Sequence, residues 1–349
     1  MATIPLEYTG KIHPPSGGIW NEQVNRKLYP YYPDNGLKEA VKLAIQLNRP
    51  LLLEGEPGCG KSELARAVFY EFSQGQGENW HFRLWNIQST SKAQDGFYTY
   101  DYIGRLQAAQ IAQLEKLKST NPEDYIGRLQ AAQLSQLEKV NSTNPEDYLE
   151  YGPLGHAFLE HGETDNIKSR NIVLIDEIDK ADIDFPNDLL LALEDQCFEI
   201  KDVRPRRWLT ANKDAPPIIF ITSNQEKELP NAFLRRCLYH YVEFPDEKAL
   251  IDIINGRFSA PPETLINAAI GRFLALREDM NDNKEETDKK VSTSELIDWF
   301  QVLNLHIRNE ENGIDETKLN DIIKELEKNK LPYNGTLLKN RQDKQEYGE

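Results

Sequence analysis

The chain has few cysteines, no excess of basic residues and no long hydrophobic run. Its three cysteines, Cys59, Cys197 and Cys237, are odd in number and far apart. This spacing argues against a disulfide framework or a zinc site, and it predicts reduced thiols in the cytoplasm. The first residues lack the basic and then apolar pattern of a signal peptide. No apolar run approaches the roughly 18 residues of a membrane-spanning helix.

The charge balance restricts the class of partner. Acidic residues number 57 against 41 basic ones, which gives a formal net charge of −16 over 349 residues. Non-specific nucleic-acid binding depends on basic residues that neutralise phosphates. We therefore expect neither a membrane nor a nucleic acid as partner.

A glycine-rich turn at 55–62 carries the strongest motif. It reads GEPGCGKS, directly after the apolar run 50–53 and before a helical pattern. This is G-x-x-x-x-G-K-S in a strand–loop–helix context, which is typical of a phosphate-binding loop. Two glycines let the backbone turn its N–H groups toward an anion. The candidate residues for binding ATP or ADP are Gly55, Pro57, Gly58, Cys59, Gly60, Lys61, Ser62 and Glu63.

Three of these loop residues have distinct expected tasks. Lys61 would reach the β- and γ-phosphates, and Ser62 would hold Mg²⁺. Cys59 would contribute its backbone N–H, and a redox role for its thiol is the alternative.

Two acids at the end of an apolar strand form the second motif. Residues 172–177 read IVLIDE, and a continuous apolar run suits a parallel strand that is buried on both faces. Asp176 would hold Mg²⁺ together with Ser62. Glu177 would act as the general base that polarises the attacking water.

Further candidates follow on the next apolar strand and helix. Asn224 comes directly after the strand predicted at 218–222, where its amide would orient the water; the alternative is an asparagine that only turns the chain. Arg235 and Arg236 close a short helix before another strand. One of them, with Arg236 preferred, would serve as an arginine finger in a neighbouring subunit's site. The alternative is a surface pair that neutralises acids or a helix end.

The order of elements predicts an α/β fold with a parallel sheet. We expect an irregular arm at 1–36, an α/β nucleotide-binding domain at 37–245, a helical region at 246–332 and a loosely ordered polar tail at 333–349. Helices are predicted near 37–48, 246–258, 262–277, 293–306 and 316–329, with a solvated loop over the charged run 278–290. Strands are predicted at 50–53, 82–87, 171–175, 218–222 and 239–244, with a hairpin over 198–210.

A tandem repeat lies inside the α/β region. Residues 101–123 recur at 124–146 with four changes. Each unit has the cap, first-turn proline and apolar stripe of one helix. Two units are too few for a solenoid, so we expect a helical insert lengthened by duplication. Whether it has a function or is a tolerated surface elaboration stays open.

Together these motifs resemble an AAA+ ATPase, and more narrowly the MoxR family. The stretches that carry the resemblance are 49–67 (RPLLLEGEPGCGKSELARA), 148–158 (YLEYGPLGHAF), 171–190 (NIVLIDEIDKADIDFPNDLL), 218–245 and 291–299 (VSTSELIDW). The resemblance covers roughly residues 30–310. It implies an α/β domain with a helical lid, assembled as a homo-oligomeric ring, usually of six, with ATP between subunits.

The resemblance also implies details of the insert and of the partner. The family carries an insert that falls at about 95–165 here. It also carries a hairpin, which corresponds to the one near 198–212. Phe97, Tyr98 and Tyr100 are candidate pore aromatics, although we favour ordinary packing for them. MoxR-type ATPases act as chaperone-like remodellers, often with a partner that bears a von Willebrand factor A domain.

One position departs from related ATPases. Many of them carry an arginine at the start of the third lid helix that touches the γ-phosphate. The corresponding stretch here, residues 292–295, reads STSE and has no arginine. The way in which the lid would respond to the nucleotide is therefore left open by the sequence.

Two other functions compete with a protein remodeller. The first is a DNA-associated or defence-system motor. A motor that handles DNA would need a basic surface, and the cluster Arg204, Arg206 and Arg207 offers a small one. A nucleotide-gated scaffold would bind without hydrolysing, which Lys61, Asp176, Glu177 and Asn224 together argue against.

Overall fold

The computed structural model describes residues 6–75, 78–110, 144–159, 163–164, 167–284, 289–309, 311 and 313–348. Its centre is a parallel sheet of five strands in the order β12–β3–β11–β8–β4, and the short β7 pairs antiparallel with the start of β8. The predicted α/β fold is confirmed. The strands are β3 (Leu51–Glu54), β4 (Glu78–Asn86), β7 (Glu163–Thr164), β8 (Ile167–Asp176), β11 (Ile218–Ser223) and β12 (Leu238–Tyr241).

The sheet separates two hydrophobic cores. Along β8, Ile172 and Leu174 belong to one core while Val173 and Ile175 belong to the other. Successive side chains of a strand point to opposite faces, so both faces of the sheet are buried. The apolar run predicted for this strand therefore reflects two packed layers.

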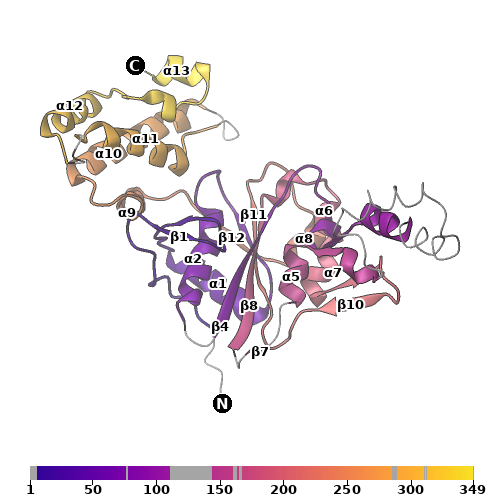
Figure 1. Cartoon of the computed structure of the whole chain (residues 1–349). Helices are drawn as coiled ribbons and strands as arrows, with labels where there is room; N and C mark the ends of the chain where they lie inside the picture. Colours follow the sequence, from indigo (N-terminus) through magenta and orange to yellow (C-terminus); the bar gives the residue numbers. More distant parts are fainter. Residues whose placement is uncertain are drawn as a thin grey trace, which may run out of the picture.

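Helices cover both faces of the sheet, as Figure 1 shows. The first face carries α1 (Asn35–Leu47) and α2 (Lys61–Ser73). Asp34 caps α1 by accepting a hydrogen bond from the Leu37 N–H at 2.7 Å. The second face carries α5 (Pro153–Leu159), α6 (Phe185–Asp188), α7 (Leu190–Asp195), α8 (Asn231–Leu234) and the hairpin of β9 (Cys197–Ile200) and β10 (Arg207–Thr210).

The N-terminal arm contains a short hairpin that the sequence reading missed. Its strands are β1 (Ile19–Asn21) and β2 (Arg26–Leu28). The arm also contacts the first helix of the C-terminal region, α9 (Glu247–Arg257). The Gly17 N–H donates to the Gly256 carbonyl at 2.9 Å, and the Arg257 guanidinium lies 3.6 Å from the centre of the Tyr29 ring. The arm thus connects the α/β region to the helices that follow it.

The C-terminal helical region has a hydrophobic core of its own, and we name it the lid. It contains α9, α10 (Glu263–Asn283), α11 (Thr293–His306) and α12 (Glu316–Glu327). The loop predicted over 278–290 is wrong for its first part, because α10 continues to Asn283. Met280 is fully buried and extends the apolar stripe of the helix into the charged run.

The polar tail is folded onto the lid, contrary to the loosely ordered tail that we expected. It contains α13 (Arg341–Tyr347), and Leu337 and Leu338 are buried in the lid core. Asp343 forms an ion pair with Lys284 at 2.6 Å, with both side chains nearly buried. Two buried leucines and one ion pair are enough to anchor an otherwise polar segment.

The two ends of the insert are joined by a short ladder, which we name the insert clamp. Strand β5 (Tyr98–Tyr100) pairs antiparallel with β6 (Leu149–Tyr151), and the Asp101 N–H donates to the Tyr148 carbonyl at 2.9 Å. Residues 102–110 are helical, as the repeat predicts, and most of the repeat lies outside the described residues. Among the described residues, no helix combines the length and the apolar character needed to cross a bilayer.

Candidate functional site

The phosphate-binding loop lies between β3 and α2, as the motif predicts. Gly58 and Gly60 have φ values of 79° and 95°, a backbone region that residues with a Cβ rarely adopt. A Cβ on Gly58 would also lie 2.6 Å from the Ser292 hydroxyl oxygen of the lid. Glycine is required at Gly58 for both reasons, so the loop and the lid approach each other closely.

The Lys61 ammonium lies inside this loop. Its Nζ donates to the carbonyls of Gly55 at 2.7 Å and Glu56 at 2.9 Å, and lies 3.8 Å from the Cys59 sulfur. Lys61 is 6% exposed, and burial lowers its pKa. Burial also raises the pKa of the Cys59 thiol, and this effect outweighs the nearby ammonium. The thiol is therefore mostly protonated at neutral pH, which argues against a redox role for it.

Asp176 meets Ser62 at the mouth of the loop. The Ser62 hydroxyl donates to Asp176 Oδ1 at 2.6 Å, and the Thr222 hydroxyl donates to the same oxygen at 2.6 Å. Thr222 also accepts the backbone N–H of Glu177 at 2.8 Å. Two strands, β8 and β11, and the start of α2 thus deliver oxygen atoms to one point, because the carboxyl ends of β8 and β11 are neighbours in the sheet.

These oxygen ligands fit a magnesium ion. Among the described residues there is no cluster of three or more His, Cys, Asp or Glu side chains placed to hold a metal. Mg²⁺ is commonly held by one or two protein oxygens together with the phosphates of its substrate, so a larger cluster is not needed. Ser62 and Asp176 are the residues that would hold it.

Glu177 and Asn224 lie together beside this point. The Asn224 side-chain amide is 3.4 Å from Glu177 Oε1, and the Lys180 ammonium donates to Glu177 Oε2 at 2.5 Å. Glu177 has a φ of 60°, a strained conformation for a residue with a side chain, and its N–H bond to Thr222 helps to hold it there. Two side chains, Asn224 and Lys180, therefore hold the carboxylate, and Thr222 holds the backbone beneath it.

The position of Asn224 depends on a buried acid that the sequence reading missed. Asp179 is 2% exposed, and its Oδ2 accepts the backbone N–H groups of Asn224 and Glu226, both at 3.0 Å. Asp179, Lys180 and Thr222 all lie within three residues of predicted site residues, yet nothing in their spacing marks them.

The arginine pair lies apart from this group. Arg236 donates to the Glu194 carboxylate at 2.5 Å and to the Ala232 carbonyl at 3.0 Å, while Arg235 is exposed at the end of α8. Neither arginine lines the cavity around the phosphate loop. Within one chain, the structure therefore does not bring Arg235 or Arg236 to Glu177.

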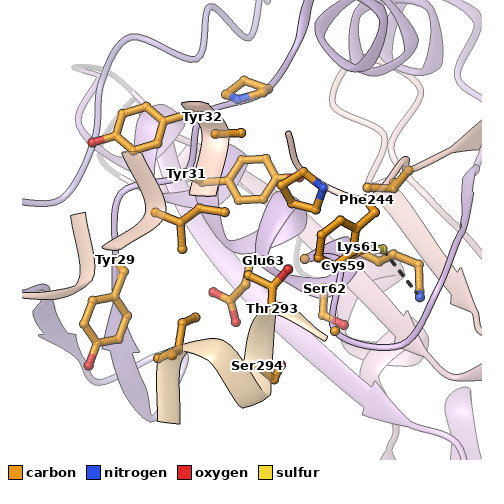
Figure 2. A pocket seen from close by; sticks show the side chains of 18 of the residues that line it. Tyr29, Tyr31, Tyr32, Cys59, Lys61, Ser62, Glu63, Phe244, Thr293 and Ser294 are labelled. Carbon is orange, nitrogen blue, oxygen red and sulfur yellow. Dashed lines mark hydrogen bonds between the residues drawn. The ribbon is translucent and has the colours of Figure 1, made fainter. Parts of the chain in front are cut away.

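The loop opens into a cavity of about 760 Å³ between the α/β region, the arm and the lid. Figure 2 shows Cys59, Lys61 and Ser62 on one side, Tyr29 and Tyr32 of the arm on the other, and Tyr31 between them. Thr293 and Ser294 of α11 also line it. The cavity has the volume of a nucleotide site, with a polar end at the loop and an aromatic end at the arm.

The candidate pore aromatics and the arginines of the basic turn both contact other side chains of the same chain. Phe97, Tyr98 and Tyr100 are buried, and Phe97 and Tyr98 stack on Phe198, so the favoured packing interpretation is confirmed. In the basic turn, Arg206 pairs with Glu199, and Arg207 bonds Glu146 and the Tyr151 hydroxyl. These pairs reduce the basic surface that a DNA-handling motor would use.

Comparison with known proteins identifies the domain type. The family model for the AAA domain (dynein-related subfamily) matches residues 50–237, which is more than half of the chain. No curated protein matches the chain. A chain in the solved HORMA:CdnC:Trip13 complex of E. coli MS115-1 is 13% identical to this one, with a TM-score of 0.40; the match covers 82% of this chain and 77% of that chain.

Proposed function

Because the chain belongs to the AAA domain family, in its dynein-related subfamily, we propose that it binds ATP with Mg²⁺ at residues 55–63 and hydrolyses it to ADP and phosphate. One observation carries this proposal. Ser62, Thr222, Asp176 and Glu177 form a continuous hydrogen-bonded chain at the mouth of the phosphate loop.

The residues around the mouth of the loop have distinct proposed tasks. Lys61 and the backbone N–H groups of the loop bind the phosphates. Ser62 and Asp176 hold Mg²⁺, which offsets the negative charge that develops on the phosphate oxygens. Glu177 accepts a proton from the attacking water, and Asn224 orients that water toward the γ-phosphate.

The catalytic test is the substitution Glu177→Gln, which keeps the shape of the side chain and removes the base. We expect ATP binding to persist while the rate of hydrolysis falls by about 10²–10⁴. The matched control is Glu228→Gln, which makes the same change of side chain at an exposed residue just after Asn224. This control should hydrolyse ATP at the wild-type rate. Hydrolysis by Glu177→Gln at the control rate would refute the assignment of the base.

We further propose that the active unit is a ring, with six subunits as the expected number. In it, Arg236, or Arg235 in its place, reaches the nucleotide of the adjacent subunit. Support comes from their position, because both arginines lie outside the cavity of their own chain. Arg236 would exchange its Glu194 partner for phosphate oxygens, as arginine fingers do when they contribute about 10³–10⁵ in rate.

Mixing two inactive variants tests the shared site. Glu177→Gln and Arg236→Ala should each be inactive alone. A mixture should regain activity, because random assortment at equal amounts restores about one quarter of the interfaces in a ring built from head-to-tail contacts. If rings form and the mixture of two inactive variants stays inactive, Arg236 acts within its own chain. Activity of Arg236→Ala alone would show that Arg236 is not the finger. The same mixing with Arg235→Ala identifies which arginine is the finger.

The proposed biological role is a MoxR-type remodelling ATPase acting on a protein client. The matched subfamily includes the MoxR proteins, and the resemblance in sequence assigns the two MoxR elements to residues 95–165 and 198–212. The proposed division is an arm at 1–36, an ATPase domain at 37–245 and a lid from 246 onward. The same resemblance makes a protein with a von Willebrand factor A domain the proposed partner, in the cytoplasm.

A further inference from the structure

Arg277 of the lid helix α10 is a buried cation at the edge of the phosphate loop. It is 6% exposed. One of its guanidinium nitrogens donates to the Val291 carbonyl at 2.5 Å, and the group lies 3.6 Å from the centre of the Phe244 ring. The other terminal nitrogen donates to the carboxylate of Glu56. Three contacts of different kinds hold this side chain in one orientation.

Glu56 belongs to the phosphate loop, between Gly55 and Pro57. Its carboxylate accepts the hydrogen bond from Arg277, while its backbone carbonyl accepts one from Lys61 at 2.9 Å. A single loop residue therefore contacts both the phosphate-binding lysine and a buried arginine of the lid. The contact is also long in sequence, since Arg277 and Glu56 are 221 positions apart.

The charges make this contact responsive to movement. A guanidinium that is mostly out of water depends on its partners, because an uncompensated buried charge is costly. A displacement of Glu56 therefore changes the environment of Arg277. Close packing adds to the coupling, because Gly58 lies against Ser292 at the start of α11. The loop and the lid thus meet at two adjacent points.

We propose that Glu56 and Arg277 form a latch that positions Lys61 and reports the nucleotide to the lid. The inference rests on the proposed ATP binding at residues 55–63. Phosphate oxygens draw the Lys61 ammonium away from the Gly55 and Glu56 carbonyls, the loop backbone adjusts at Glu56, and Arg277 passes this adjustment to α10. Arg277 is thus a positioning residue, and it reaches the loop from the second lid helix.

The principal test variant is Glu56→Gln, because Glu56 is partly exposed and the replacement leaves the lid core intact. Hydrogen exchange is followed on the full chain with and without a non-hydrolysable ATP analogue. In the wild type we expect the analogue to slow exchange both in the loop at 51–60 and in α10. In Glu56→Gln the loop should still be protected, whereas the response of α10 should disappear.

A second readout separates positioning from simple structural support. Steady-state hydrolysis by Glu56→Gln should show a KM for ATP raised by about threefold to tenfold, with a smaller change in kcat. That is the size expected when the carboxylate acceptor of a charge-assisted hydrogen bond is replaced by a neutral amide oxygen. The conservative variant Arg277→Lys keeps the positive charge, so it should retain part of the change in α10 hydrogen exchange that Glu56→Gln loses. The controls are Glu278→Gln, an exposed neighbour on α10, and Arg272→Lys, whose guanidinium bonds the Asn329 carbonyl inside the lid. Both should behave as the wild type.

The outcomes distinguish the two proposals. If the analogue protects neither the loop nor α10 in the wild type, ATP binding at this loop is wrong. If it protects the loop and the α10 response persists unchanged in Glu56→Gln, the latch is wrong while ATP binding stands.

Discussion

At the scale of single residues, the Thr222 hydroxyl joins the two acids of the site. It donates to Asp176 and accepts the N–H of Glu177, and the side chain is 1% exposed. One oxygen atom thus sets the side chain of one acid and the backbone of the other. A buried hydroxyl that is used twice is costly to remove, because both of its partners lose a bond.

The substitution Thr222→Val tests this role, because it keeps the shape and removes the hydroxyl. We expect the free energy of unfolding to fall by about 1–3 kcal/mol. We also expect kcat to drop by about tenfold or more, since each 1.36 kcal/mol of lost transition-state stabilisation is tenfold in rate. Thr222→Ser should retain most of both quantities. Thr210→Val, at an exposed strand position, is the control for the valine replacement. Wild-type kcat in Thr222→Val would show that the hydroxyl does not position the acids.

Cys59 gives a prediction about pH. Its thiol is buried and its pKa is raised, so less thiolate is present near neutral pH than in a free cysteine. Alkylation of Cys59 by iodoacetamide at pH 7.5 should therefore be slow in the folded protein and should speed up as the pH rises. Mass spectrometry of the same site in urea supplies the reference rate. Rapid labelling of folded protein at neutral pH would contradict the assignment and reopen a redox role.

At the residue scale, the sequence predicts proximity where a motif fixes both the residue type and the spacing. Ser62 bonds Asp176, and Lys61 and Glu177 line the same cavity, because the strand order brings the loop and β8 to one edge of the sheet. The catalytic roles of these residues stay predictions. Arg277 could not be found this way. Its contact with Glu56 depends on how the lid packs onto the α/β region, and no local pattern encodes that packing.

At the scale of elements, the lid contains two segments whose polar composition wrongly predicts irregular structure. The charged residues after 277 suggested a loop, yet α10 continues because Met280 is buried at helical spacing from Leu276. The polar tail suggested disorder, yet Leu337 and Leu338 complete the lid core. In both places a few apolar side chains decide the structure, and the average polarity of the segment hides them.

The tail therefore contributes to the stability of the lid. Leu338 is 1% exposed, and Leu338→Ala should lower the free energy of unfolding of the lid by about 2–5 kcal/mol, as expected when a buried leucine leaves a cavity. Chemical denaturation followed by tryptophan fluorescence measures the change, since Trp299 lies in the same core. Leu305→Ala, at an exposed position of α11, should change it by less than about 0.5 kcal/mol. Equal stability of Leu338→Ala and Leu305→Ala would mean that the tail does not support the lid.

At the scale of the whole molecule, the lid and the insert leave the sheet on opposite sides (Figure 1). The lid contacts the phosphate loop, whereas the insert clamp packs against the core that includes the β9–β10 hairpin. The two attachments use different elements and belong to different hydrophobic cores. Changes in the insert are therefore expected to leave the latch between Glu56 and Arg277 intact.

Deleting residues 124–146 tests this independence. The deletion removes one repeat and shortens the segment between the clamp strands from 48 residues to 25. Because the entropic cost of joining the two ends of a segment grows by only about 0.6 kcal/mol for each doubling of its length, stability should change by about that amount. ATP hydrolysis per subunit should be retained. Loss of folded protein, or of hydrolysis, would show that the second repeat supports the ATPase core.

The insert clamp also affects how easily the number of repeats can change during evolution. Tyr100 and Leu149 are paired whatever lies between them, so a whole 23-residue unit can be gained or lost without shifting the register of any strand in the central sheet. The associated closure cost is smaller than the roughly 0.8 kcal/mol that one buried methylene contributes. Among close descendants of this gene, copy number should therefore drift more readily than the sequence of the clamp itself.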